Sequence, residues 1–151
     1  MAEFVLPGPL VDFERIHEHH LCVELFIANS ATIHEFVADG RCEIGLAVAD
    51  STAGGGETLQ EIPFVDDEVV LAVPEGYAWA AAEEVELEDL VRMPMVMRDP
   101  GASSRQTVES ALAAQGLSLA SPLAEVGSTS AAKATALSER APLPACGTGR
   151  R

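Results

Sequence analysis

The segment RDPGASSR, residues 98–105, stands between two stretches with different periodicity. Residues 94–97 before it form a short apolar run, which predicts a strand. Residues 103–115 after it carry apolar side chains at helical spacing and are followed by Gly116, which predicts a helix. A strand, a turn of small residues and a helix in this order indicate a βαβ-like unit, and therefore a mixed α/β fold.

Outward from this segment, strand-like and helix-like stretches alternate along most of the chain. Helical spacing of apolar residues predicts helices over residues 6–16, over a stretch that begins at Asn29 or Ser30 and ends at Gly40, and over 87–91 and 129–137. Alternating or continuous apolar runs predict strands over residues 21–27, 43–48, 59–65, 68–73 and 123–126. Two strands joined by one short helix favour right-handed βαβ crossovers.

The composition changes twice, and each change suggests a boundary. Residues 75–86 are rich in Ala and Glu and lack an apolar stripe, so we expect a connection over 75–93 between a first lobe at 1–74 and a partial second lobe at 94–137. Residues 138–151, SERAPLPACGTGRR, show no periodicity. They are expected to form a disordered or aberrant tail.

Charge limits the partners that the chain can bind. The sequence has 24 Asp and Glu against 9 Lys and Arg, a formal net charge of −15. Such a surface repels phosphate backbones and anionic headgroups, so we expect no measurable binding to duplex DNA and none to membranes. No apolar run approaches the roughly 20 residues that a membrane span requires.

The cysteines indicate a reducing compartment. Cys22, Cys42 and Cys146 are odd in number and show no C-x-x-C spacing, so neither a disulfide framework nor a structural zinc site is expected. The start of the chain has no secretory pattern. These features predict a cytoplasmic protein.

Several short motifs follow one another in a recognisable order. They are Leu6-Pro7 with Leu10 and Phe13, residues 39–46, residues 62–64 with 67–74, Leu87-Glu88-Asp89-Leu90, residues 98–105 with Glu109 and Gly116, and residues 125–129. Together, over residues 6–133, they resemble the effector-binding domain of LysR-type transcriptional regulators. The segment 98–105 resembles the R-E-x-G-S-G-T-R pattern of the branch of that family that regulates sulfur and carbon assimilation.

The resemblance implies a two-lobed α/β fold of the periplasmic-binding-protein-like type 2, with a small effector between the lobes and no cofactor. It also implies a homodimer formed through the helix at 6–16 and the strand at 21–27. The fold is expected to be incomplete, because the helix-turn-helix, the linker helix, the first strand and the returning strands of the family are not recognised in the sequence. DNA binding would then belong only to an intact regulator.

Three turns of small or polar residues can supply a binding site for an anion. Small residues let a ligand approach the backbone, and the first N–H groups of a helix lack internal partners and favour a negative charge. The candidate effector-binding residues are Gly101, Ser103, Ser104, Arg105, Ser128, Thr129, Asn29 and Ser30. The alternative is that Ser30, Ser103 and Ser128 are helix N-caps, and that Arg98 and Arg105 pair with Asp99 or Glu109 at the surface.

Catalysis and metal binding have weaker support in the sequence. His17, His19, His20 and Cys22 lie close together in the sequence, and His34 follows. No two of these residues have the i, i+4 spacing of a zinc-binding helix, so no metal is expected. No G-x-S-x-G motif marks a nucleophile, so the chain is expected not to be an enzyme. The remaining alternatives to an effector domain are a stand-alone small-molecule-binding module and a small hydrolase.

Overall fold

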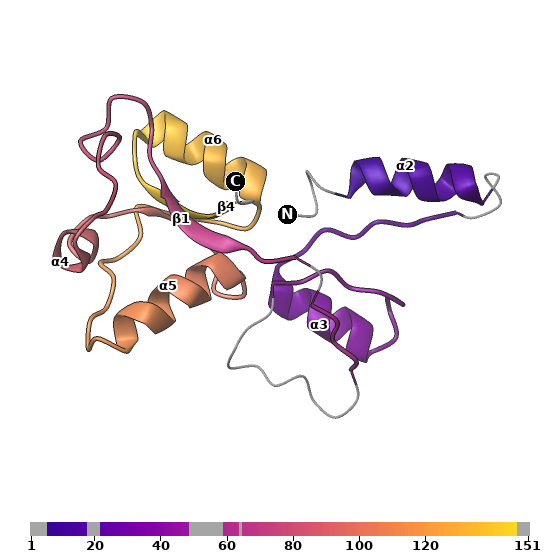
Figure 1. The fold of residues 1–151 in the computed structure, drawn as a ribbon. Helices are drawn as coiled ribbons and strands as arrows, with labels where there is room; N and C mark the ends of the chain where they lie inside the picture. The colour runs from indigo at the N-terminus through magenta and orange to yellow at the C-terminus, as the bar shows by residue number, and fades with distance from the viewer. Residues whose placement is uncertain (1–5, 18–21, 49–58, 64, 148–151) are drawn as a thin grey trace.

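The structure, a computed structural model, describes residues 6–17, 22–48, 59–63 and 65–147. The described elements are α2 (Pro7–Ile16), α3 (Ser30–Ala38), β1 (Glu68–Ala72), α4 (Leu87–Leu90), β2 (Val96–Arg98), α5 (Ser103–Ala113), β3 (Ala124–Val126), α6 (Thr129–Glu139) and β4 (Leu143–Gly147). Figure 1 shows α2 and α3 apart from the group formed by the four strands and the later helices. The mixed α/β architecture agrees with the prediction.

The C-terminal half, here residues 65–147, contains two small two-stranded sheets. β1 pairs with β4 in an antiparallel sheet, and β2 pairs with β3 in a parallel one. A hydrogen bond from the Val96 N–H to the Pro142 carbonyl, 2.9 Å long, joins β2 to the segment before β4. Helices α5 and α6 lie on opposite sides of β1 and β4 in Figure 1, and both pack on the strands.

The core of this half forms where α6 meets the strands. Val96 and Leu143 are almost completely buried, and they pack with a row of alanines: Ala132, Ala136, Ala141 and Ala145. The small side chains on α6 let the helix backbone come close to β2, β3 and β4. On the other side, Leu112 of α5 is 1% exposed.

The expected disordered tail at 138–151 is wrong up to Gly147. Helix α6 continues to Glu139, Arg140 takes a left-handed conformation with φ 51°, and the chain then enters β4. Periodicity did not reveal this strand, because Leu143, Pro144 and Ala145 are all buried instead of alternating. Residues 148–151 lie outside the described residues.

The N-terminal half contains helices but no paired strands in its described residues. Residues 22–28 and 43–48 belong to no β ladder, and neither do 59–63, so the strands predicted at 21–27, 43–48 and 59–65 are wrong for the residues that the structure describes. An apolar pattern selects the faces of an extended chain, but a strand also requires a hydrogen-bonded neighbour. β1, the last strand expected in the first lobe, finds that neighbour in β4.

Helix α3 packs on these extended segments. A Cβ on Gly45 would lie 2.7 Å from Ile33 Cγ2 and 2.8 Å from Val37 Cγ2, so the helix leaves no room for a side chain there. The rings of Phe26 and Phe36 meet edge to face at 6.3 Å. No helix in the described ranges is both long and apolar enough to cross a membrane.

Candidate functional site

The candidate site that contains most of the residues predicted from the sequence is a pocket of about 350 Å³ between the two halves of the molecule. The N-terminal half contributes Leu6, Ala28, Asn29, Ser30 and residues 46–48. The C-terminal half contributes Asp67, Arg98, residues 102–104, Thr129, Ala132, Lys133 and residues 143–146. The pocket thus brings together the start of α3, the start of α5 and the start of α6, the three turns that the sequence analysis selected.

The start of α5 differs from the N-cap alternative. The N-cap residue is Ala102, whose side chain has no hydrogen-bonding group, so Ser103 is the first residue of the helix and not its cap. Ser103 and Ser104 both line the pocket, and Ser104 is only 7% exposed. The uncapped first turn supplies the partial positive charge that an anion requires.

The start of α6 combines a cap and a pocket residue. The Ser128 hydroxyl accepts a hydrogen bond from the Ala131 N–H at 3.2 Å, so the N-cap alternative is correct for Ser128. Ser128 is not among the pocket-lining residues. Thr129 lines the pocket, and its hydroxyl accepts a 2.5 Å hydrogen bond from Nη1 of Arg98.

Asn29, and not Ser30, caps α3. Its carboxamide oxygen accepts the Thr32 N–H at 2.9 Å, and its Nδ2 donates to Oδ1 of Asp99 at 2.5 Å. Both Asn29 and Ser30 line the pocket, but the side chain of Asn29 is already engaged with protein partners on two sides.

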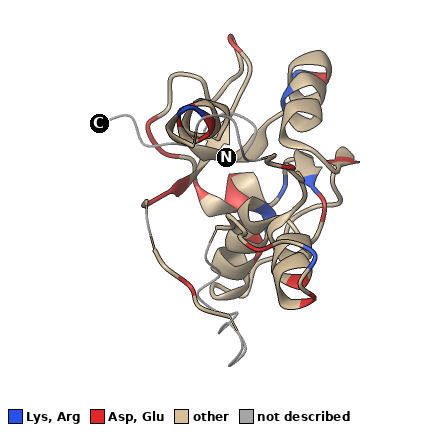
Figure 2. Ribbon diagram, turned by 90° about the vertical axis from the view of Figure 1, so that its right-hand side faces the viewer, with Lys and Arg blue, Asp and Glu red and all other residues tan. Residues whose placement is uncertain are grey.

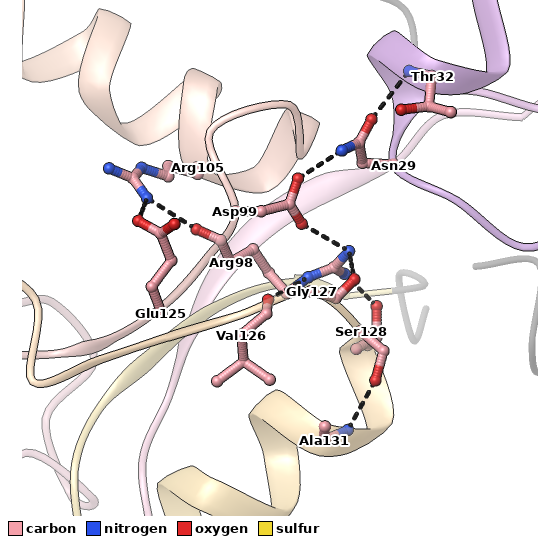
Figure 3. A network of polar contacts seen from close by, with 11 residues as sticks. Asn29, Thr32, Arg98, Asp99, Arg105, Glu125, Val126, Gly127, Ser128 and Ala131 are labelled. Carbon is pink, nitrogen blue, oxygen red and sulfur yellow. Dashed lines mark hydrogen bonds and ion pairs between the residues drawn. The ribbon is translucent and has the colours of Figure 1, made fainter.

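The Arg98 guanidinium contacts two backbone carbonyls and the carboxylate of Asp99, as Figure 3 shows. Its Nε donates to the Val126 carbonyl at 3.2 Å and its Nη2 to the Gly127 carbonyl at 3.1 Å, while Nη2 also lies 3.4 Å from Oδ2 of Asp99. The side chain is 13% exposed, so Arg98 is a part of the pocket wall and not a solvated surface ion.

The structure places Arg105 away from the pocket lining. Its guanidinium donates at 2.7 Å to Glu109 and at 2.7 Å to Glu125, and at 3.0 Å to the Arg98 carbonyl. The hydrogen bond to Glu109, and then that to Glu125, raises the pKa of Arg105 above its usual value. The predicted pairing of Arg105 with Glu109 is confirmed, but the Arg105 side chain is only 16% exposed, so it is not a solvated surface ion, and it joins α5 to β3.

Gly101 also lies outside the lining, where it shapes the junction behind the pocket. A Cβ at this position would lie 2.6 Å from Nδ2 of Asn29, and the Gly101 carbonyl accepts the Ala31 N–H at 3.4 Å. The loop after β2 therefore approaches the start of α3 as closely as a glycine permits.

Three charged or reactive pocket residues were missed in the sequence. Lys133 lies one helical turn after Thr129, a spacing that places both on one face of α6. Oδ2 of Asp67 is buried and has no geometrically defined hydrogen-bond partner in the part of the chain that the structure describes. Burial raises the pKa of the Cys146 thiol, and the carboxylate of Asp67 raises it further. Asp67 and Cys146 meet only because β1 pairs with β4, which the sequence did not predict.

The described histidines do not gather at this site. His34 lies 3.9 Å from a carboxylate oxygen of Glu61, and the His17 ring contacts Phe13 with centroids 4.5 Å apart. His19 and His20 lie outside the described residues. Within the described ranges, no three His, Cys, Asp or Glu side chains are grouped so that they could hold a metal ion.

Comparison with known proteins gives consistent relatives. The chain is 26% identical over 117 residues to the HTH-type transcriptional regulator CysL of Bacillus subtilis (strain 168), covering 78% of this chain and 38% of the relative. It is 24% identical over 108 residues to a probable RuBisCO transcriptional regulator of Cyanophora paradoxa, covering 72% and 33%. The chain thus spans little more than a third of the length of these curated relatives.

Solved structures share the fold at low sequence identity. The regulatory domain of CcmR from Synechocystis PCC6803, solved in complex with 2-PG, superposes with a TM-score of 0.80 at 18% identity, covering 99% of this chain and 72% of that one. HinK, a LysR family transcriptional regulator from Pseudomonas aeruginosa, superposes with a TM-score of 0.71 at 19% identity, covering 99% and 50%. These likenesses confirm the predicted periplasmic-binding-protein-like fold.

The family itself is shown by a match over most of the chain. The model of the LysR substrate binding domain matches residues 1–141, nearly the whole length. The recognition made from the ordered motifs at 6–133 is therefore confirmed. This chain belongs to the LysR substrate-binding domain family of transcriptional regulators.

Proposed function

We propose that the chain senses a small anionic metabolite, which binds in the pocket between α3, α5 and α6. The observation that carries this proposal is the charge of the pocket lining. In a chain with a net charge of −15, the charged residues of the lining, among those that the structure describes, are Arg98 and Lys133 against Asp67. Figure 2 shows how widely Asp and Glu are spread over the ribbon in contrast. A positive pocket in an acidic protein favours an anion.

The buried carboxylate on the opposite wall suggests a second property of the ligand. A buried carboxylate oxygen without a strong donor is costly, and within the described residues Oδ2 of Asp67 has none, since the neighbouring Cys146 thiol is only a weak donor. A hydroxyl or ammonium group on the ligand would satisfy it. We therefore propose anions that also carry a hydrogen-bond donor as the first compounds to test.

Thermal melts with a panel of anions test the proposal. The panel contains inorganic phosphate, sulfate, small carboxylates with and without a hydroxyl group, and 2-phosphoglycolate (2-PG), because the CcmR regulatory domain was solved with 2-PG. We expect at least one of them to raise the melting temperature in a concentration-dependent manner. If none stabilises the wild type, the proposal is wrong.

Two substitutions at Ser103 locate the anion. Ser103→Ala removes one hydroxyl but keeps the backbone N–H groups, so anion affinity should fall by roughly 1 kcal/mol. Ser103→Asp places a negative charge at the start of α5, where it suits the helix but repels the ligand, so the anion effect should disappear while the fold persists. Ser121→Asp adds the same charge outside the pocket lining and serves as the control. Equal anion responses in Ser103→Asp and wild type would contradict binding at α5.

A stand-alone binding module and a small hydrolase are the alternatives. The curated relatives are transcriptional regulators, which supports a sensing role over catalysis. We propose that the chain has no enzymatic activity, that it acts in the cytoplasm, and that this segment does not itself bind DNA. Release of product from generic esters, or salt-dependent binding to duplex DNA, would contradict these points.

We also propose that the chain forms a homodimer through α2 and the extended segment at 22–28. Val11, Phe13 and Ile16 on α2 are exposed, at 53%, 43% and 75%, as are Val23 and Leu25 on the segment. Several large apolar side chains exposed on one helix and one neighbouring chain segment are typical of an interaction surface. Light scattering should give twice the mass of one chain, and a monomer at high concentration would contradict the dimer.

A further inference from the structure

Asp99 contacts both walls of the pocket, although it does not line the pocket itself. Its Oδ1 accepts the hydrogen bond from Nδ2 of Asn29, on the N-terminal wall, at 2.5 Å. Its Oδ2 lies 3.4 Å from Nη2 of Arg98, on the C-terminal wall. The Asp99 side chain is 21% exposed, so water screens these contacts only partly. Figure 3 shows the continuous path from Thr32 through Asn29 and Asp99 to Arg98.

The backbone around this contact is equally close. The Gly101 carbonyl accepts the Ala31 N–H at 3.4 Å, and Gly101 leaves no space for a Cβ against the Asn29 carboxamide. Within the described part of the chain, no helix or strand of the C-terminal half packs extensively on α3. The junction of Asn29 with residues 99–101 is therefore the main hydrogen-bonded link between the start of α3 and the C-terminal half.

We propose that Asn29 and Asp99 are positioning residues that form a polar latch between the two walls of the pocket. The latch fixes the start of α3 against the turn between β2 and α5, and so sets the separation of Ser30 from Ser103 and Arg98. The inference rests on the proposed function, because the pocket must bind an anion for the latch to influence affinity. Asn29 then serves the site through Asp99 and not by touching the ligand with its side chain.

The two residues can be exchanged to test the latch. Asn29→Asp keeps an acceptor for the Thr32 N–H, so the cap of α3 survives, but it puts two carboxylates in contact at neutral pH. Asp99→Asn keeps an oxygen that can accept from Asn29. The double variant Asn29→Asp/Asp99→Asn restores a donor facing an acceptor, with the donor now on residue 99.

Hydrogen exchange of the amides in α3, measured by mass spectrometry on the full chain without ligand, gives the readout. We expect Asn29→Asp to accelerate exchange in α3 roughly tenfold, and Asp99→Asn to change it little. The double variant should return close to the wild-type rate, although the two positions are 70 residues apart. If Asn29→Asp accelerated exchange only by weakening the N-cap of α3, a second substitution in the β2–α5 turn would not restore the wild-type rate. Unchanged exchange in Asn29→Asp, or a double variant as fast as Asn29→Asp, overturns the latch.

A second arm uses millimolar inorganic phosphate and separates the two proposals. Where phosphate raises the melting temperature of the wild type, it should also slow exchange in α3, and this slowing should be lost in Asn29→Asp and regained in the double variant. Phosphate that stabilises the wild type without slowing α3 contradicts the latch alone. Should neither phosphate nor any anion of the panel stabilise the wild type, the proposed function fails, while the ligand-free comparison still decides whether the contact joins the two walls.

Discussion

The two halves of the molecule have similar apolar sequence patterns but differ in how far their apolar side chains are buried. In the C-terminal half, Val96 is 0% and Leu143 2% exposed. In the N-terminal half, Ile16 is 75% and Ile44 84% exposed, and neither α2 nor α3 has a buried residue. The difference arises from pairing, because β1 to β4 have hydrogen-bonded neighbours and the extended N-terminal segments have none among the described residues. In this molecule, apolar side chains are buried where the strands pair with neighbouring strands and helices pack on them.

The sharpest way to break this comparison is to truncate one apolar residue in each half. Leu143→Ala removes a side chain from the centre of the core and should lower the free energy of unfolding by about 2–5 kcal/mol. Ile44→Ala removes a similar side chain from an exposed position and should change it by less than about 0.5 kcal/mol. Urea titrations of both variants and the wild type, followed by circular dichroism, measure the difference.

A much larger loss of unfolding free energy in Leu143→Ala than in Ile44→Ala is expected only if the C-terminal half is the stable unit. Equal losses in the two variants would show that Ile44 is covered in solution, for example by a second copy of the chain. Repeating the titrations at several protein concentrations separates these cases, because only a dimer-buried Ile44 gives stability that rises with concentration.

A smaller effect is expected where the halves touch. Gly101→Ala places a methyl group within 2.6 Å of the Asn29 carboxamide, so the turn or α3 must move, at a cost of about 1–3 kcal/mol. Gly127→Ala is the matched control, since nothing lies within 4 Å of its Cβ position. Thermal melts compare the two. A neutral Gly101→Ala would mean that the two halves are not held in contact at this turn.

The sequence predicted the fold well where the signal was local. The strand predicted at 94–97 overlaps β2, the helix predicted from residue 103 corresponds to α5, and the ordered motifs led to the correct family. Helices α2 and α3 also lie where helical spacing placed them. Local patterns succeed here because the turn and the helix face are specified by neighbouring residues.

The failures were all non-local. The sequence predicts a tail where β4 forms, because a strand that is buried without alternation and contains Pro144 has no periodic signature. The sequence predicts strands at the extended segments 22–28 and 43–48, because it shows an apolar face but does not show that these segments lack a paired strand among the described residues. Lys133 and Asp67 were missed for the same reason, since only the tertiary structure brings α6 and β1 to the pocket.

The smallest and most local prediction concerns two of the three cysteines, Cys22 in the N-terminal half and Cys146 in the C-terminal half. Cys22 is exposed in the N-terminal half, whereas Cys146 is half-buried on β4 beside Asp67. Burial and the nearby carboxylate raise the pKa of Cys146, so at a given pH a smaller fraction of it is thiolate, the form that reacts with alkylating agents. Iodoacetamide at mildly alkaline pH should therefore label Cys146 several-fold more slowly than Cys22, and raising the pH should narrow the difference. Asp67→Asn removes the nearby carboxylate, the smaller of the two causes of the raised pKa of Cys146. It should therefore accelerate the alkylation of Cys146 without changing that of Cys22. Peptide mass spectrometry follows both sites in one sample, and the fully unfolded chain, in which the two rates should converge, is the control. If Cys146 reacts as fast as Cys22 in the folded chain, then β4 is not held against β1 in solution, and the contrast between the two halves fails at the strand that the sequence did not predict.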